Sequence, residues 1–329
     1  MGQHGPVTRY LTTAAGTEAA ADRADVEKLL KGGRLLWLDL VQPQQDDAGL
    51  LRDVFGVHPL AVEHAMNFGQ RPRIETYDDV TYLAAYGATG FGKDLVEVHV
   101  LYAEQFMITI RRDGCPAIDE IREQLRSHLS RPRRMQGPPR LILLHHILDG
   151  LIDGFFPALS EFDDRIDDLQ QRIFSQPSND ELSELFAMQR WLVGVRKLVA
   201  PQRDMMAAVA AGVISLPAMT ARAEPYLRDL YDHLIRVGDL LDSYRDLLSN
   251  AMDVYLSTVS NRLNQVMKQL TIIATVFLPL SFLTGFFGQN FSWLVRHLQG
   301  IPAFLILGIG TEIAAVAALF IVFRRRGWL

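Results

Sequence analysis

Two long apolar runs at the C-terminal end of the chain constrain its fold more than any other feature. The eighteen residues from Leu270 to Phe287 carry no charge, and a helix of that length crosses a lipid bilayer at 1.5 Å per residue. A second apolar run, Ile301 to Phe323, follows a short polar link. The sequence therefore predicts two membrane-spanning helices joined as a hairpin and preceded by a large water-soluble region.

Basic residues near the ends of these runs predict their orientation. Two precede the first run and three follow the second: Arg262, Lys268, Arg324, Arg325 and Arg326. By the positive-inside rule both termini are cytoplasmic, the loop faces outward, and the protein is expected in the plasma (inner) membrane. The lone Cys115 excludes an intramolecular disulfide and fits a reducing compartment. A net charge of −5 gives no reason to expect nucleic acid as a partner.

The soluble region is predicted to be α+β, with an N-terminal α/β domain at residues 1–139 and a helical region at 140–224. Strand-like runs lie at 34–40, 81–85, 96–102 and 106–110, with helical patterns at 25–31, 46–55 and 58–66. These elements predict a small sheet flanked by helices. Two long amphipathic helices are then expected at 141–174 and 180–212, the second capped by Ser178 or Asn179.

One long helix is predicted to join the soluble region to the membrane. Between Pro225 and Pro279 the only helix breaker is Gly238, which allows a stalk helix at 225–288 that continues into the first span. A helix of this length needs partners along its side, and self-association is the economical answer. An outer loop at 289–300, a second span at 301–323 and a basic tail at 324–329 complete the chain.

The motifs of common enzymes are absent from the sequence. It holds no GxGxxG, Walker A, HExxH or paired CxxC pattern. The nearest approach to a catalytic set is His145, His146, Asp149 and Asp153 on one predicted helix. This set is either a metal site or, as we favour, a mixed polar helix face. The chain is therefore not expected to be an enzyme.

Heptad steps along the long helix collect acidic and then small polar residues on one face. One series is Asp239, Asp246, Asp253, Ser260, Met267, Ala274, Ser281 and Gly288, and the other is Ser257, Asn264, Thr271, Leu278 and Gly285. Carboxylates at a dry helix seam would be destabilising, whereas several copies around water would attract cations. The alternative is a solvated face that runs into ordinary span residues. The polar continuation through Asn264, Thr271 and Ser281 favours a pore.

The end of the first span carries the motif Thr284-Gly285-Phe286-Phe287-Gly288-Gln289-Asn290. Glycines beside amides let backbone and side-chain oxygens face a shared axis, although a Gly-Asn pair also ends ordinary helices. Residues 252–291 resemble the pore helix and signature of the CorA family of magnesium transporters, which have Tyr/Phe-Gly-Met-Asn at this place. The resemblance extends to residues 226–233, 58–60, 71–73 with Tyr77, and the tail that ends in Trp328-Leu329.

The resemblance implies a funnel-shaped homopentamer that imports Mg²⁺, with Co²⁺ or Ni²⁺ as further substrates, and no cofactor beyond Mg²⁺ as substrate and regulatory ligand. The implied selectivity filter is Gly288, Gln289 and Asn290, with Gln289 in place of Met. The implied pore lining adds Asp253 as an acidic ring, Asn264 as a lower polar site, and Met267, Leu270 and Leu278 as a hydrophobic constriction. Asp229 aligns with a carboxylate that binds regulatory intracellular Mg²⁺ between subunits. The acidic residues Glu161, Asp163, Asp164, Asp167 and Asp168 either share in this or form a solvated face.

One departure from the family pattern keeps alternatives open. Glu312 lies midway along the second span, where a charge is expensive, so it is a candidate proton site or is hydrogen-bonded between helices near Gly308 and Gly310. One rival function is therefore proton-coupled zinc transport of the ZntB kind. Another is a membrane-anchored scaffold that conducts nothing.

Overall fold

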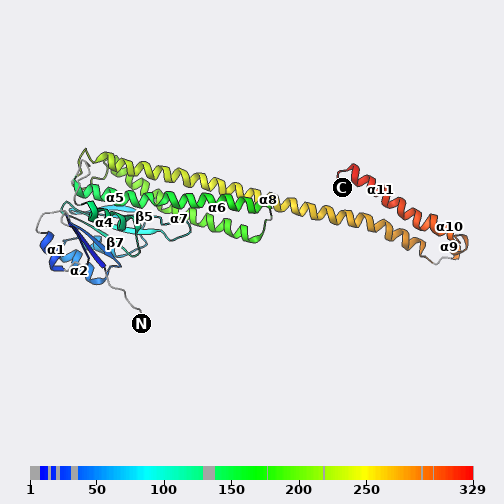
Figure 1. Cartoon of the computed structure of the whole chain (residues 1–329), viewed down its shortest axis with the longest axis horizontal. Helices are drawn as coiled ribbons and strands as arrows, with labels where there is room; N and C mark the ends of the chain where they lie inside the picture. Colours follow the sequence, from blue (N-terminus) through cyan, green and yellow to red (C-terminus); the bar gives the residue numbers. More distant parts are fainter. Residues whose placement is uncertain are drawn as a thin grey trace, which may run out of the picture. The chain divides into compact units, whose positions relative to one another are not determined.

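The protein is described by a computed structural model over residues 8–13, 16–19, 23–30, 36–128, 138–175, 177–217, 219–289, 292–298 and 300–328. The chain forms two compact units, Met1–Met252 and Asp253–Leu329. Figure 1 shows the helices and strands of both units. The predicted filter residue Asn290 lies outside the described residues.

A seven-stranded mixed sheet forms the centre of the first unit. Its strands are β1 (Thr8–Thr13), β2 (Gly16–Ala19), β3 (Leu36–Val41), β4 (Arg73–Tyr77), β5 (Val80–Gly87), β6 (Val96–Tyr102) and β7 (Phe106–Arg111). Their order is β2-β1-β3-β7-β6-β5-β4, and β3 and β7 are parallel, with Leu36 opposite Phe106. All the other neighbouring pairs are antiparallel. The predicted α+β class with a sheet flanked by helices is confirmed.

Alternating side chains place helices on both faces of this sheet. Helices α1 (Arg23–Leu30), α2 (Gln45–Asp53) and α3 (Pro59–Met66) share a hydrophobic core with every second residue of β3 and β7. Helices α4 (Pro116–His128), α5 (Pro139–Asp153) and α7 (Asn179–Ala210) also contact the strands. Trp37, which alternates with the core residues of β3, donates its indole N–H to Thr109 Oγ1 at 3.0 Å.

The helical region differs from the sequence prediction at one point. The expected helix at 141–174 is two helices, α5 and α6 (Phe155–Ser175), with Gly154 between them. A Cβ at Gly154 would collide with the carbonyl oxygen of Ala88, so this position requires glycine. Helix α7 begins after Ser178, whose side chain accepts from the N–H of Asp180, and Ser178 is one of the two expected caps.

Helix α8 (Glu224–Phe287) is a single helix of 64 residues that begins in the first unit and ends in the second. The second unit continues with α9 (Ser292–His297), α10 (Ile301–Ala303), the π-helix η1 (Phe304–Gly310) and α11 (Thr311–Arg325). Lys268 Nζ lies 3.4 Å from the Gly327 carbonyl, and the Thr284 hydroxyl lies 2.8 Å from Glu312 Oε1. Because later residues of α8 meet earlier residues of α11, the two helices form an antiparallel hairpin.

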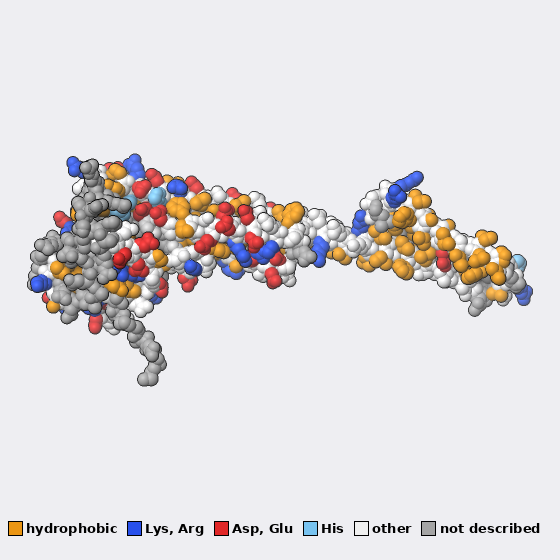
Figure 2. Space-filling model, viewed as in Figure 1, with side chains coloured by type: hydrophobic (Ala, Val, Ile, Leu, Met, Phe, Trp, Pro, Cys, Tyr) orange, Lys and Arg blue, Asp and Glu red, His pale blue; other side chains and the backbone are white. Residues whose placement is uncertain are grey.

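Three helical stretches are long and apolar enough to cross a membrane, namely Pro139–Ser175, Glu224–Phe287 and Ile301–Arg325. The apolar window of the first is 56% buried inside its own unit, whereas those of the other two are 0% buried. Figure 2 shows hydrophobic side chains gathered over the helices of the second unit. The two stretches that leave apolar side chains without protein cover are therefore those predicted to span the membrane.

Candidate functional site

The first candidate site is a cluster of acidic and histidine side chains where α5 and α8 pack within the first unit. Two of its residues sit one helical turn apart on α8, Asp229 and His233, and three lie on α5: His145, Asp149 and Asp153. The potential ligand atoms fall into two groups, each within 4.8 Å: His145 with Asp149 and Asp229, and Asp149 with Asp153 and His233. These five residues are called the α5–α8 cluster.

The polar atoms of this cluster are close together yet poorly satisfied. His145 Nε2 lies 3.4 Å from Asp229 Oδ2, and His233 Nδ1 lies 3.5 Å from Asp153 Oδ1. His145 is only 5% exposed, and neither of its ring nitrogens has a hydrogen-bond partner among the described residues. Burial and the neighbouring Asp149 carboxylate raise the pKa of Asp153 above its ordinary value. Crowded carboxylates and unpaired imidazole nitrogens are the environment that a divalent cation relieves.

The donor set indicates which cations the cluster can hold. Carboxylate oxygens suit Mg²⁺, which retains several of its own water molecules when it binds. Imidazole nitrogens favour Co²⁺, Ni²⁺ and Zn²⁺. Asp229 and the α5 residues were each expected as candidates from the sequence, but His233 was missed. Its spacing of four residues from Asp229, which places both on one helix face, was the available signal.

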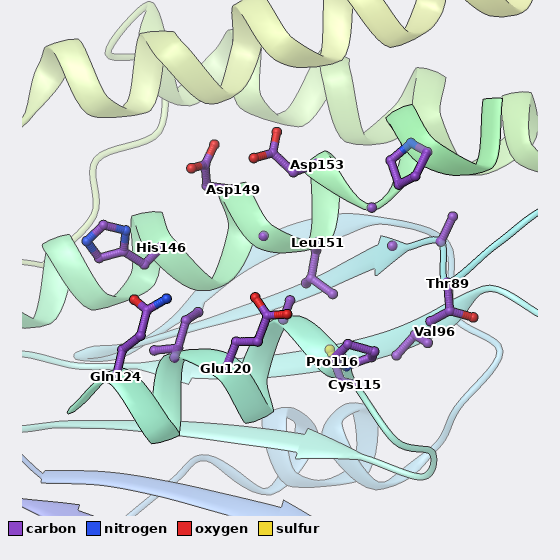
Figure 3. Close-up of a pocket in the computed structure, with 17 residues that line it drawn as sticks. Thr89, Val96, Cys115, Pro116, Glu120, Gln124, His146, Asp149, Leu151 and Asp153 are labelled. Carbon is purple, nitrogen blue, oxygen red and sulfur yellow. The ribbon is translucent and has the colours of Figure 1, made fainter. Parts of the chain in front are cut away.

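A cavity of about 420 Å³ lies beside the cluster, between α5, α4 and the ends of β5 and β6. Its polar lining includes Thr89, Glu120, Gln124, His146, Asp149 and Asp153. Figure 3 shows Asp149 and Asp153 projecting from α5 away from the sheet, whereas Glu120 projects from α4 toward α5. Asp149 and Asp153 therefore line the cavity and also face His233 on α8.

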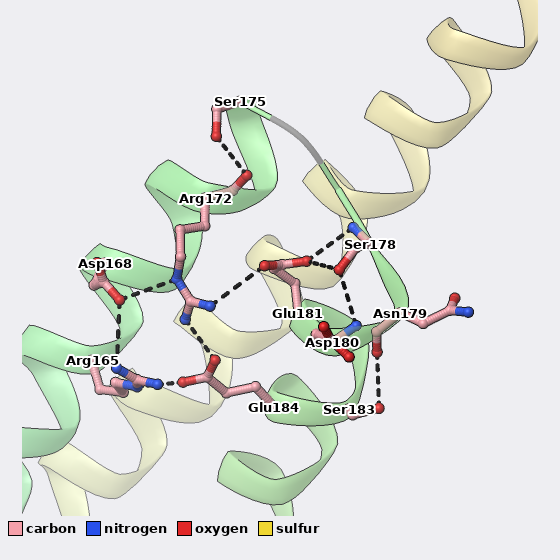
Figure 4. A network of polar contacts seen from close by, with 10 residues as sticks. All are labelled: Arg165, Asp168, Arg172, Ser175, Ser178, Asn179, Asp180, Glu181, Ser183 and Glu184. Carbon is pink, nitrogen blue, oxygen red and sulfur yellow. Dashed lines mark hydrogen bonds and ion pairs between the residues drawn. The ribbon is translucent and has the colours of Figure 1, made fainter.

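The acidic residues of α6 are partly engaged in other contacts. Asp168 pairs with Arg172 at 3.1 Å and with Arg165 at 3.6 Å, in a network that joins α6 to the start of α7 (Figure 4). Glu161 accepts the backbone N–H of Phe91 at 2.9 Å. Burial and the neighbouring carboxylates of α6 raise the pKa of Asp163. Asp168 and Glu161 thus have structural partners, and these contacts favour the interpretation of a polar helix face.

The second candidate site is the polar stripe along the membrane half of α8. It comprises Asp253, Ser257, Ser260, Asn264, Met267, Leu270, Thr271, Ala274, Leu278, Ser281 and Gly285. All of them lie on the continuous helix α8, and every one is exposed in the single chain. Steps of seven residues return a side chain to almost the same side of an α-helix, so all of these residues except Leu270, which is in neither heptad series, follow one side of α8. The structure of one chain thus presents the stripe without a partner.

The C-terminal end of α8 positions the described part of the predicted filter. Gly288 donates its N–H to the Thr284 carbonyl at 2.9 Å, and Gln289 donates to the Phe286 carbonyl at 3.3 Å. A Cβ at Gly288 would lie 3.0 Å from the Thr284 oxygen, a distance that few side chains tolerate. Glycine therefore allows the chain to turn tightly as the helix ends.

Glu312 lies on α11 and faces this end of α8. Its Oε1 accepts a hydrogen bond from the Thr284 hydroxyl at 2.8 Å. The contact joins the second apolar helix to the residue one helical turn before Gly288.

These features define a class: integral membrane proteins with a soluble α/β unit, a long connecting helix and an apolar helical hairpin. A cobalt/magnesium transport protein CorA from Thermotoga maritima is 32% identical over 287 residues, 84% of this chain and 78% of that protein. The solved structure of the CorA magnesium transporter from Methanocaldococcus jannaschii matches with a TM-score of 0.82 at 20% identity, over 99% of this chain and 100% of that one. A zinc transport protein ZntB from Yersinia enterocolitica is 26% identical, over 81% of this chain and 78% of that protein.

The chain belongs to the family described as CorA-like Mg²⁺ transporter protein, whose model matches residues 32–325. The match covers strands β3 to β7 of the sheet, the long helix and both apolar helices. The resemblance noted in the sequence is thereby confirmed, and the family is one of ion transporters rather than enzymes.

Proposed function

We propose that the protein forms a homopentameric channel that carries Mg²⁺, and also Co²⁺ or Ni²⁺, across the plasma membrane. The polar stripe on α8 is the observation that carries this proposal. Ser257, Asn264 and Thr271 place oxygen atoms seven residues apart along one side of α8, from the last turns expected in the cytoplasm to the start of the apolar run. Copies of α8 packed around an axis would turn this stripe into rings of oxygen, the lining that a hydrated cation requires.

The proposed pore has an outer mouth, an apolar constriction and an inner entrance, and each has its own role. Mg²⁺ gives up its water reluctantly, so Gly288, Gln289 and Asn290 are proposed to recognise the hydrated ion through carbonyl and amide oxygens. Met267, Leu270 and Leu278 are proposed to form a narrow apolar constriction that conducts only when it is wetted. A ring of Asp253 side chains would concentrate cations at the inner end.

We further propose that intracellular divalent cations regulate conduction at the α5–α8 cluster. The cluster joins α5 to α8, and α8 continues into the proposed pore. A cation that binds one arrangement of α5 and α8 more tightly than another shifts the population toward that arrangement. Binding to Asp229 and its neighbours would hold the channel closed when internal Mg²⁺ is high, which gives negative feedback.

The proposed topology has both termini in the cytoplasm and residues 288–300 outside. It is supported by the basic residues that precede the first apolar run and follow the second. In this arrangement the exposed apolar faces of α8 and α11 meet lipid or neighbouring subunits.

The main rival is proton-coupled zinc transport. The polar stripe contains no Cys or His, the ligands that favour Zn²⁺, which supports the magnesium proposal. Relatives named as zinc transport proteins match at a lower identity than the first of those named as magnesium transport proteins.

Uptake of Mg²⁺ and Zn²⁺ into proteoliposomes, with and without a pH gradient, tests the proposal. Mg²⁺ uptake that needs no proton gradient supports it, whereas Zn²⁺ uptake driven by protons would favour the rival. Asn264→Ala should reduce the flux, and Gln265→Ala should not, because Gln265 lies about 100° further around the helix. Flux of neither ion would leave a non-conducting scaffold as the remaining interpretation.

A further inference from the structure

Glu312 is the one ionisable side chain between Ile301 and Phe323, and there is none between Gln269 and Gln289 on the partner helix. Among the described residues, the carboxylate has a single polar contact, with the Thr284 hydroxyl at 2.8 Å. The ionisable groups nearest in the sequence are Arg324, at the opposite end of α11, and His297 on α9, whose Nδ1 contacts the Trp293 carbonyl at 2.9 Å. The runs Leu270–Phe287 and Ile301–Phe323 contain no basic side chain that could neutralise Glu312.

The protonation state of Glu312 determines which hydrogen bonds the Thr284 hydroxyl can make. Its hydroxyl lies 2.8 Å from the Leu280 carbonyl and 2.8 Å from Glu312 Oε1, but a hydroxyl has only one hydrogen. If Glu312 is ionised, one of the two oxygens goes without its bond. If Glu312 carries a proton, it can donate to Thr284 Oγ, and Thr284 then donates to Leu280. Both contacts of the Thr284 hydroxyl are hydrogen bonds at the same time only when Glu312 carries a proton.

The same threonine connects Glu312 to the mouth of the proposed pore. The Thr284 carbonyl accepts the N–H of Gly288 at 2.9 Å, the bond that ends the helical turn before the filter. Helix α11 therefore holds the side chain of Thr284, and the backbone of Thr284 holds Gly288. A change in the hydrogen bonding of Glu312 is therefore transmitted to the backbone at Gly288 through Thr284 alone.

The backbone before Glu312 has an unusual geometry. The π-helix η1 ends at Gly310, and the Thr311 hydroxyl lies 2.5 Å from the Leu307 carbonyl and 3.1 Å from the Gly308 carbonyl. A Cβ at Gly310 would lie 3.3 Å from the Leu305 carbonyl. A π-helical turn rotates the residues after it relative to an α-helix, and such turns are frequent at functional sites. Here it sets the side of α11 on which Glu312 lies.

We propose that Glu312 is a protonatable positioning residue for the pore mouth. In its protonated form it completes the hydrogen bonds of Thr284 and holds the last turn of α8, so the mouth keeps the geometry that recognises hydrated Mg²⁺. Loss of the proton leaves a charge between the two helices and removes one of these bonds. The flux of Mg²⁺ then falls, and its preference over Co²⁺ weakens. The flux part of this inference rests on the proposed transport function.

Infrared difference spectroscopy on the full-length protein in lipid nanodiscs tests the protonation directly, whether or not the protein conducts. The wild type minus Glu312→Gln spectrum at neutral pH should contain the carbonyl stretch of a protonated carboxylic acid. In Thr284→Val this band should shift, because the hydrogen-bond partner of the acid is lost. A difference spectrum with only carboxylate bands would overturn the proposal.

Mg²⁺ uptake by proteoliposomes between about pH 5 and about pH 9 tests the consequence for transport. Wild-type flux should fall as the pH rises, whereas Glu312→Gln, which retains a donor, should lose this dependence. Thr284→Val should lower the flux about three- to tenfold, the effect of one hydrogen bond. Thr258→Val is the matched control, because Thr258 also donates to a carbonyl four residues earlier, at 2.8 Å, and lies off the polar stripe. His297→Gln should keep the wild-type pH profile.

The outcomes separate the two proposals. An acid band without flux would overturn the transport function and leave the protonation of Glu312 standing. Flux with the same pH profile in wild type and Glu312→Gln would overturn the positioning role.

Discussion

Helices α5 and α8 meet at His233, whose Nδ1 lies 3.2 Å from Asp149 Oδ1. The contact joins a helix that packs on the sheet to the helix that continues into the apolar hairpin. Both atoms are buried without a well-formed hydrogen bond, so a cation between them would satisfy both.

Replacing Asp149 with Asn should weaken cation binding at the α5–α8 cluster. A tenfold loss of affinity lowers the stabilisation by saturating Mg²⁺ or Co²⁺ by about 1.4 kcal/mol. Thermal unfolding of the full-length protein with and without the cation measures this loss. Asp204→Asn is the control, since Asp204 is exposed on α7 and pairs with the adjacent Arg203. Equal stabilisation of the two variants would contradict the assignment.

Asp39 should be essential to the stability of the first unit. It is 1% exposed and pairs with Arg111 at 3.0 Å and Arg122 at 2.6 Å. Asp39→Ala leaves two guanidinium groups without their shared buried partner, and we expect a loss of about 3–5 kcal/mol in the free energy of unfolding. Asp119→Ala touches the same arginines, but Asp119 is 50% exposed, so its loss should stay below about 1 kcal/mol. If urea unfolding gave similar losses in the free energy of unfolding for Asp39→Ala and Asp119→Ala, this distinction would be refuted.

Glu97 should make stability depend on pH in the acid range. Burial alone would raise its pKa, but hydrogen bonds from His99 and from the backbone N–H groups of Gly69 and Gln70 lower it below 4.5. A lowered pKa means that Glu97 stabilises the fold above its unfolded-state value and that this stability is lost as the pH falls through the folded value.

Glu97→Gln should therefore cost about 1–3 kcal/mol at neutral pH, and the difference from wild type should shrink below about pH 4. Glu104→Gln, at an exposed position before β7, provides the comparison. A cost that persists unchanged in acid would show that charge is not the cause.

Replacing Gly87 or Gly194 with alanine should change the free energy of unfolding in opposite directions. A Cβ at Gly87 would lie 2.7 Å from the Leu151 carbonyl, so Gly87→Ala should destabilise by about 1–3 kcal/mol. Gly194 lies inside helix α7 with no atom within 4 Å of the added Cβ, so Gly194→Ala should stabilise by about 0.5–1 kcal/mol. Chemical denaturation of both variants checks the pair. Destabilisation by Gly194→Ala would point to a contact with another subunit.

Much of the fold could be predicted from hydrophobic periodicity. The strands around Leu38, Leu83, Val100 and Ile108 all have continuous or alternating apolar residues, and all were expected. Strand β4, with the sequence RIETY, was missed because it is a half-exposed edge strand with little periodicity. Helix α4 was also missed, although Ile118, Ile121 and Leu125 have helical spacing.

The contacts between helices at the candidate sites could not be predicted from the sequence. The spacings of Asp149 with Asp153 and of Asp229 with His233 are each visible along the chain, but their meeting depends on how α5 packs against α8. The Thr284–Glu312 bond likewise depends on the register of two apolar helices, which the π-helix η1 alters. The residues of the polar stripe could be listed from the sequence because they belong to a single helix. The pore roles and domain boundaries assigned from the sequence stay predictions.

Uptake of Mg²⁺ by the purified protein in liposomes tests the central claim most directly. Wild type and Asn290→Ala would be compared at equal protein content, with Gln289→Met as a variant that restores the residue typical of the family. We predict rapid Mg²⁺ entry for wild type and Gln289→Met and a loss of at least about tenfold for Asn290→Ala, as expected when oxygen ligands of the hydrated ion are removed. Equal Mg²⁺ entry in wild type, Asn290→Ala and protein-free liposomes would contradict the account.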